Sequence, residues 1–252
     1  MENQIETGII LLAGRGSRLE ELTDNKPKCL VEVNGLPIIH RILDELALLN
    51  IKKMILVVGY LAEQIKNYVG DEWGGMKIEY VNNEDWDQTN NVVSFYMALD
   101  RINTNFLLLE GDIVVSKNAL KSFTDLNMMA IDEYKDYMDG TVVKLSDNNK
   151  IVEKFYLKSS PGRPDNLKGF YKTVNIYSFD YNDFFQHIEP HLKEIIDQDK
   201  VNSYYELAFA KAVNSNEISF KPLNFHNKKW AEIDDQKDLQ YAEKLFSENL
   251  DQ

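Results

Sequence analysis

The segment TGIILLAGRGSRL, residues 7–19, joins an apolar run typical of a buried strand to a short loop of glycine and arginine. Glycine lets the loop backbone turn its N–H groups towards a phosphate, and arginine adds a mobile positive charge. The loop lacks the spacing of a P-loop, and Leu19 stands where a dinucleotide-binding fingerprint has its third glycine. A Gly-x-Gly loop alone is equally typical of an ordinary tight turn, but this one has the features that a bound triphosphate needs.

Outward from this loop, the first half of the chain alternates between strand-like and helical patterns. The apolar runs that we expect to be further buried strands are 54–59, 77–82 and 106–112. Helical spacing is found at 36–49, at 62–69 and in a third segment that starts at Asn90 or Asn91 and runs towards Arg101. Because strand and helix alternate, we expect a Rossmann-like α/β fold with a parallel sheet.

The second half is less regular, and we expect it to complete a mixed sheet. Strands are expected at 140–145 and 172–179, and helices at 183–196 and 204–213. A length of 252 residues with 44% hydrophobic content suits one core, and no linker or repeat divides the chain. We therefore predict a single domain over 1–252, with a nucleotide-binding half over about 1–115 and an acceptor-binding half over about 116–252.

The amino-acid composition limits the classes of partner and the cellular location that we expect. Lys and Arg total 28 against 41 Asp and Glu, and the net charge of −13 disfavours nucleic acid and anionic membranes. No segment has the length and apolarity of a membrane span or the features of a secretory signal, and one cysteine permits no internal disulfide. A cytoplasmic protein is expected; whether it forms a homo-oligomer is left open.

A phosphorylated ligand of so acidic a chain needs a local group of cations. Arg15, Arg18, Lys26 and Lys28 fall within one fourteen-residue stretch. Pro27 favours an extended backbone between the two lysines, so that they point to different sides, and we expect Lys28 to face the ligand and Lys26 the solvent.

Several motifs together resemble the nucleoside-triphosphate transferase family. They are LAGRGSRL at 12–19, KPKCLV at 26–31, NGLP at 34–37, EGD at 110–112 and WAEIDD at 230–235. The motifs span nearly the whole chain. The resemblance implies a Rossmann-like three-layer sandwich with a mixed, mostly parallel central sheet.

Two of the segments point to one branch of that family. TNNVVS at 89–94 and the Trp-x-Glu-Ile-Asp ending are similar to phosphocholine and 2-aminoethylphosphonate cytidylyltransferases. The chain lacks the Gln-x-x-x-x-Gly-Thr/Ala pattern that sugar nucleotidyltransferases commonly present near Asn90. The resemblance thus implies transfer of CMP from CTP to a small phosphate- or phosphonate-bearing acceptor, with pyrophosphate released; a sugar-1-phosphate nucleotidyltransferase is the neighbouring alternative.

The resemblance also assigns the chemistry to particular side chains. Asp112 and Asp234, with Glu232, are hard oxygen ligands suited to Mg²⁺. Lys28 would contact the α-phosphate or the acceptor, and Arg18, rather than Arg15, the β- and γ-phosphates. The structural alternatives are a turn residue for Asp112 and a solvated acidic face for Glu232 and Asp234.

Base recognition is expected from the backbone at Leu12 and Ala13 and from the amide of Asn91 and the hydroxyl of Ser94. Helix capping is the structural alternative for these side chains. The full predicted nucleotide set is Leu12, Ala13, Gly14, Gly16, Ser17, Arg18, Lys28, Asn91, Ser94 and Asp112.

An aromatic and polar group in the second half is expected to bind the acceptor. It comprises Tyr171, Lys172, Asn175, Tyr205 and Glu206. Aromatic rings and an acid suit an ammonium group, and an inward lysine suits a phosphonate or phosphate, while ordinary packing explains any single tyrosine.

Other kinds of site and function fit the sequence less well. The four histidines are dispersed and have no cysteine partners, so zinc is not expected. A glycosyltransferase of related fold would show Asp-x-Asp where this chain has Glu110-Gly111-Asp112. A non-catalytic nucleotide-sensing subunit commonly loses some of the charges that are all present here.

Overall fold

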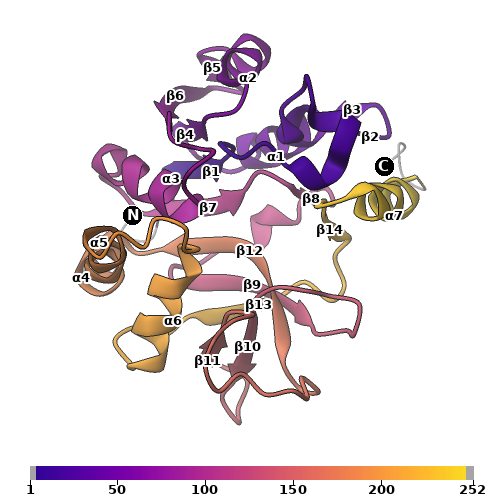
Figure 1. Cartoon of the computed structure of the whole chain (residues 1–252). Coiled ribbons are helices and arrows are strands. Elements are labelled where there is room, and N and C mark those ends of the chain that lie inside the picture. The colour runs from indigo at the N-terminus through magenta and orange to yellow at the C-terminus, as the bar shows by residue number, and fades with distance from the viewer. Residues whose placement is uncertain (1–3, 248–252) are drawn as a thin grey trace.

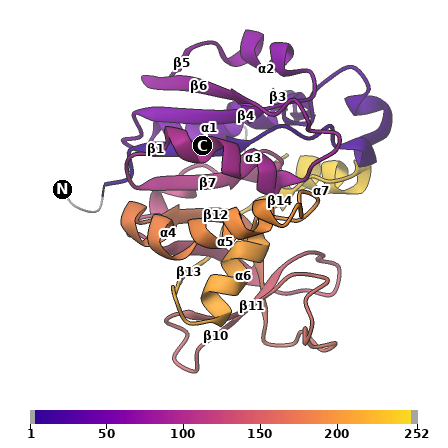
Figure 2. The same ribbon diagram turned by 60° about the vertical axis from the view of Figure 1, so that its left-hand side comes forward.

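The apolar run at the N-terminal end forms β1 (Thr7–Leu11), which lies inside a ten-stranded sheet. The computed structural model describes residues 4–247. β1 pairs in parallel with β4 (Lys53–Val58) on one side and β7 (Phe106–Glu110) on the other. Beyond β4 lie the parallel β6 (Met76–Asn82) and the short antiparallel β5 (Glu72–Trp73). Figure 2 shows these strands stacked in the order β5, β6, β4, β1, β7.

The second half of the chain continues the same sheet from β7. β12 (Tyr171–Phe179) pairs antiparallel to β7 and is followed by β10 (Val142–Leu145) and β11 (Val152–Tyr156). β9 (Met128–Glu133) also pairs with β12, and β13 (Lys221–Asn224) joins β9. The sheet is mixed, with a parallel centre, and the expected α/β fold is confirmed (Figure 1).

Helices cover both faces because successive strand residues point in opposite directions. Ile10 packs in one core cluster with α1 (Ile38–Ala47), α2 (Ala62–Val69) and α7 (Gln236–Phe246). Ile9, its neighbour, packs in the other with helices from both halves of the chain. Those helices are α3 (Asn91–Ala98), α4 (Tyr181–His187), α5 (Glu189–Asp197) and α6 (Glu206–Asn214).

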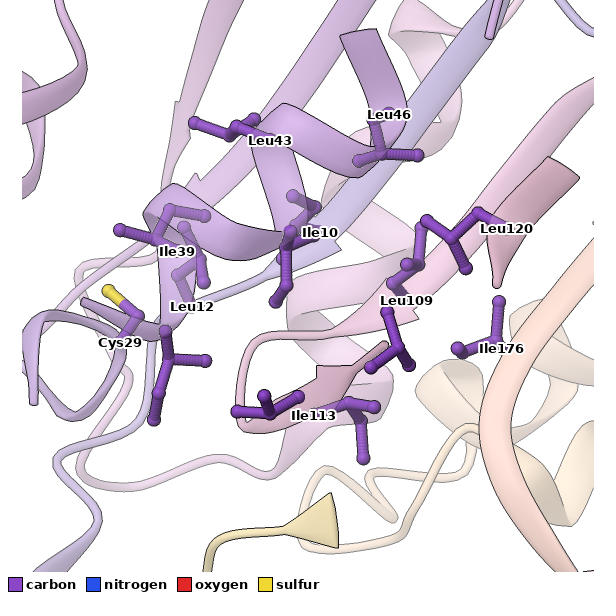
Figure 3. Close-up of a cluster of buried hydrophobic side chains, with 14 of the residues drawn as sticks. Ile10, Leu12, Cys29, Ile39, Leu43, Leu46, Leu109, Ile113, Leu120 and Ile176 are labelled. Atoms are coloured by element: carbon purple, nitrogen blue, oxygen red, sulfur yellow. The ribbon is translucent and has the colours of Figure 1, made fainter. Parts of the chain in front are cut away.

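Figure 3 shows the first cluster in detail, in which Ile39 and Leu43 of α1 belong to the same group of buried side chains as Ile10 of β1. Both Ile10 and Ile39 are fully buried. Burial of such a side chain stabilises the fold by about 1.5–3 kcal/mol. These contacts fix the strand ends from which the site is built.

Short elements complete the chain. β2 (Glu32–Val33) pairs with β3 (Leu36–Pro37), and β8 (Ile113–Val115) pairs with β14 (Trp230–Glu232). Four 3-10 turns are found at η1 (Ser17–Thr23), η2 (Lys28–Leu30), η3 (Leu99–Arg101) and η4 (Leu120–Ser122). No helix among residues 4–247 is long and apolar enough to cross a membrane.

One predicted helix is wrong in its extent. The single helix expected at 183–196 is two helices, because α4 ends at His187 and α5 begins at Glu189. Pro190 has no N–H to donate to the carbonyl four residues earlier, and its ring clashes there, so the first helix cannot continue through it.

Candidate active site

The loops that follow β1, β4, β6 and β7 meet at one edge of the sheet. Tyr60 N–H, after β4, donates to the carbonyl of Ala13 at 2.9 Å, and Gly111 N–H, after β7, donates to that of Leu11 at 3.1 Å. Asn83 N–H, after β6, donates to the Val58 carbonyl at 2.8 Å. In open α/β sheets ligands bind at these carboxyl ends, so the contacts assemble a candidate site.

Gly16 shapes the first loop. Its φ of 70° lies in the left-handed region, and a Cβ there would be 2.7 Å from Cδ of Lys28. Any larger residue would be both strained and pressed against the lysine. The glycine therefore allows the stem of Lys28 to pass directly behind the loop.

Lys28 occupies the centre of the site. Pro27 is extended, with ψ of 144°, and η2 begins at Lys28. Lys28 Nζ lies 2.7 Å from Asp112 Oδ2 and 2.9 Å from Asp234 Oδ1. Burial alone would lower the pKa of Lys28, but the two carboxylates reverse this and raise it. Lys26 is exposed, so the two lysines do point to different sides.

Asp234 is held in place by hydrogen bonds of its own N–H and of the N–H of the preceding residue, Ile233. Ile233 N–H donates to the Asp112 carbonyl at 2.9 Å, which ties the end of β14 to the loop after β7. Asp234 N–H donates to Asp238 of α7 at 3.0 Å, and Arg18 Nη2 lies 2.8 Å from Asp234 Oδ1. Burial tends to raise the pKa of Asp234, but Lys28, helped by Arg18, lowers it overall.

A second group of carboxylates adjoins this centre. Glu110, Asp112 and Glu232 each present an oxygen within 4.8 Å of the others. Asp112 Oδ1 is buried without a hydrogen-bond partner among the described residues. Burial, reinforced by the charge of Asp112, raises the pKa of Glu110 well above its usual range. Such a set of hard oxygen donors with an unpartnered oxygen fits a divalent cation.

The acceptor half contributes a buried lysine and its partners. Lys172 Nζ lies 3.2 Å from Glu232 Oε2 and donates to the Thr173 carbonyl at 2.8 Å. Asn175 Nδ2 donates to Glu232 Oε1 at 3.1 Å from a β12 residue with φ of 59°. There the pairing with β9 shifts register, which lets Asn175 turn towards Glu232. Glu206 is a nearby acid whose pKa is raised by burial, and the positive charge of Lys172 offsets part of this rise.

One cavity of about 1420 Å³ connects these groups. The predicted residues that line it are Leu12, Ala13, Gly14, Gly16, Arg18, Lys28, Asn91, Ser94, Asp112, Lys172, Asn175, Glu206, Glu232 and Asp234.

Three predicted residues do not line the cavity. Ser17 is exposed at the start of η1. Tyr171 precedes Lys172 on β12, so its side chain takes the opposite face and packs against the second core cluster. Tyr205 is fully buried, and its hydroxyl donates to Glu110 at 2.8 Å, so it supports the site from behind.

Asn91 lines the cavity, but its amide is already engaged. Nδ2 donates to Glu110 at 3.3 Å, and Oδ1 accepts from Tyr205 N–H at 3.0 Å. Asn90 caps α3, with its side chain accepting from Asn91 N–H. The amide thus joins α3 to Glu110 and Tyr205 and keeps one N–H for another partner, so its contact with a base stays a prediction.

Glu110 and Trp86 are among the lining residues that sequence reasoning missed. Glu110 is the last residue of β7, and a charged residue that ends an apolar strand beside Asp112 is a signal that could have found it. Trp86 lies in a loop without periodicity, and its ring packs on Tyr60 with centroids 5.1 Å apart.

Comparison with known proteins finds similar sequences and a similar fold. Residues 8–127 match the family model of the MobA-like NTP transferase domain. Residues 8–127, a little under half of the chain, are thus similar to an NTP transferase domain. The match contains the glycine loop, Lys28 and Asp112, and it confirms the family expected from residues 12–19. Asp234 lies outside the matched residues but completes the same centre.

Two curated relatives share parts of the NTP transferase sequence. CMP-5'-(3-aminopropyl)phosphonate synthase of Streptomyces rubellomurinus is 30% identical over 95% of this chain and 38% of that protein. UTP–glucose-1-phosphate uridylyltransferase AglF of Haloferax volcanii is 36% identical over 44% of each protein. The aligned parts thus span less than half the length of these relatives.

A solved structure shares the fold over its whole length. The CTP:phosphocholine cytidylyltransferase LicC of Streptococcus pneumoniae superposes with a TM-score of 0.80, at 24% identity, over 96% of this chain and 99% of that one. The NTP transferase fold is therefore common to both proteins.

Proposed function

We propose that the chain transfers CMP from CTP to a small acceptor bearing a phosphate or phosphonate and releases pyrophosphate. The observation that carries the proposal is Lys28 held between Asp112 and Asp234, in a cavity that runs from the glycine loop to Lys172. This arrangement offers cations near the glycine loop for a triphosphate and polar groups around Lys172, in the same cavity, for a second substrate.

In the proposed reaction an acceptor oxygen attacks the α-phosphorus of CTP. A new P–O bond forms while the bond to the bridging oxygen of the β-phosphate breaks, and pyrophosphate leaves with that electron pair. Lys28 neutralises charge at the α-phosphate, and Arg18 holds the leaving group. No covalent enzyme nucleophile is needed, because the acceptor is an anion and catalysis consists of positioning and charge stabilisation.

A divalent cation fits the same centre. Asp112 and Glu232 supply hard oxygen donors from the carboxylate group that they form with Glu110, and Asp234, which shares Lys28 with Asp112, is the third proposed ligand. The buried Asp112 Oδ1 lacks a partner in the described part of the chain. When bound, Mg²⁺ would add positive charge beside the α-phosphate and the acceptor oxygen.

The acceptor pocket favours a molecule with both charges. Glu206 is a buried acid that suits an ammonium group, and Lys172 suits a phosphorus oxyanion. The aminopropylphosphonate and the phosphocholine in the names of two similar proteins have this pair of charges. The proposed substrates and the single cysteine fit a cytoplasmic enzyme.

Pyrophosphate release with CTP, UTP, ATP and GTP tests the proposal against a panel of phosphocholine, 2-aminoethylphosphonate, 3-aminopropylphosphonate and glucose 1-phosphate. We expect pyrophosphate release that needs Mg²⁺, prefers CTP and requires an acceptor with an amino or quaternary ammonium group. Release with UTP and glucose 1-phosphate would establish the sugar alternative, which the similarity to AglF favours. Nucleotide binding without release for any acceptor would support a nucleotide-sensing protein.

A further inference from the structure

Asn83 is a buried polar residue that the proposed reaction does not use. It follows β6 directly and is 2% exposed. Its Nδ2 donates to Ser94 Oγ at 3.0 Å and to Thr89 Oγ1 at 3.2 Å, and its Oδ1 accepts from Asp85 N–H at 3.1 Å. A backbone N–H can only donate, so the contact with Asp85 settles which end of the amide is oxygen.

This orientation fixes the role of the Ser94 hydroxyl. An amide NH₂ can only donate, so Ser94 Oγ accepts from Asn83 and its own proton is directed elsewhere. Within residues 4–247 no hydrogen bond is recorded in which Ser94 donates that proton. Ser94 lines the cavity from the first turn of α3, a helix that packs against β1 and β4. The Ser94 hydroxyl is thus available to the cavity as a hydrogen-bond donor.

An aromatic side chain follows directly in sequence, because Trp86 is next to Asp85, whose N–H donates to Asn83. Trp86 also lines the cavity, and its Cβ lies 2.7 Å from where a Cβ of Gly59 would be. A side chain at position 59 would therefore displace the tryptophan. Asn83 connects the segments of the two lining residues, since it donates to the Ser94 hydroxyl and accepts from the N–H of Asp85, the residue before Trp86.

We propose that Asn83 is a positioning residue for nucleotide selection: its amide turns the Ser94 hydroxyl proton towards an acceptor atom of the pyrimidine, the O2 carbonyl or N3 of cytosine. This inference rests on the proposed function, because it assumes that CTP is the nucleotide. Asn83 does not touch the nucleotide and acts only through Ser94.

The variant Asn83→Asp tests the polarity itself. It has nearly the same shape and keeps the acceptor for Asp85 N–H, but its carboxylate accepts the Ser94 proton instead of donating to Ser94. Calorimetric titration should show CTP binding weakened about tenfold, the loss of one hydrogen bond to the base. Binding of inorganic tripolyphosphate, which has no base, should stay within about twofold of wild type, whereas a merely structural role would weaken both.

Two further variants complete the test. Ser94→Ala should lose the same factor, and the double variant should lose no more than either single one. Asn127→Asp is the matched control, because Asn127 also donates through Nδ2, to Asp183, and accepts a backbone N–H, from Asp180, yet lies outside the cavity lining. It should leave the CTP affinity unchanged.

The outcomes separate the two proposals. Wild-type affinity for CTP in Asn83→Asp or Ser94→Ala, or an equal loss of tripolyphosphate affinity, would overturn the role of Asn83 while the proposed function stands. Absence of CTP binding by the wild type would overturn both.

Discussion

At the scale of single residues, the ammonium of Lys28 neutralises carboxylates of the candidate site in the free protein. Its ammonium lies between the same two carboxylates, Asp112 and Asp234, that we propose as ligands of the divalent cation. A cation that binds there must compete with the lysine unless a phosphate draws the lysine away. Nucleotide and metal binding should therefore be coupled through this side chain.

Lys28→Met should consequently change two properties in opposite directions. CMP transfer should fall by about 10²-fold or more, since a cation beside the reacting phosphate is lost. Binding of Mn²⁺ without nucleotide, followed by the electron paramagnetic resonance signal of the free ion, should strengthen about tenfold, because two neighbouring carboxylates lose their counter-charge. Lys26→Met, at an exposed lysine, is the control and should change neither. Weaker Mn²⁺ binding by Lys28→Met would contradict the competition.

Cys29, the only cysteine, should be unreactive in the folded protein. It is 3% exposed, and burial raises the pKa of its thiol to about 12 from 9.0. At pH 8 we expect iodoacetamide labelling at least about 10³-fold slower than in denaturant, because the thiolate is the nucleophile. Rapid labelling of the native protein would contradict the burial of this thiol.

The same shift has a definite effect on stability. The unfolded thiol loses its proton as the pH rises through about 9, while the folded thiol keeps it up to about 12. The folded state then binds more protons, so the free energy of unfolding should fall between these two pH values. In urea titrations, Cys29→Ala should show a smaller fall over this range than the wild type.

At the scale of elements, the sequence predicts local patterns better than non-local pairing. The strands β1, β4, β6 and β7 and the first three helices lie where hydrophobic spacing places them, since each is a strong local signal. The break between α4 and α5 follows from Pro190. The prediction of one helix followed the helical spacing of the apolar residues and did not take this proline into account. β9 and β13 were not predicted, because their pairing partners are distant in sequence.

The candidate site divides in the same way. Lys28 and Asp112 follow from motifs beside predicted strands, and the structure brings them together. Glu110, Asn83 and Trp86 required the structure, because their roles depend on which loops meet at the sheet edge. Tyr205 was expected at the acceptor and lies behind Glu110, since composition does not reveal which face of a helix is buried.

The N-terminus of α7 offers a test of how an element supports the site. Asp235 accepts from Lys237 and Asp238 N–H, and Asp238 accepts in turn from Asp234 and Asp235 N–H. Asp235→Ala should lower the free energy of unfolding by about 1 kcal/mol, the usual value of a cap. Scanning calorimetry should show a midpoint lower by about 2–4 °C.

The control for the cap is Gln240→Ala, an exposed position on the same helix, which should leave the midpoint unchanged. An equal midpoint for Asp235→Ala and wild type would show that the cap does not support α7.

At the scale of the whole molecule, both halves of the chain share one sheet. β7 of the first half pairs with β12 of the second, and the second core cluster draws residues from both. We expect a single cooperative thermal transition, with equal calorimetric and van't Hoff enthalpies. Two separate transitions would show that the halves fold as independent domains.

The most direct test of the central claim follows the label of [α-³²P]CTP into the acceptor. With Mg²⁺ and an aminoalkylphosphonate or phosphocholine, the wild type should transfer labelled CMP to the acceptor. Asp112→Asn should lower the rate about 10²-fold or more, since the centre loses a charge. Asp147→Asn, at an exposed aspartate, should match the wild type. Transfer by Asp112→Asn at the wild-type rate would contradict the claim that CMP transfer takes place between Lys28, Asp112 and Asp234.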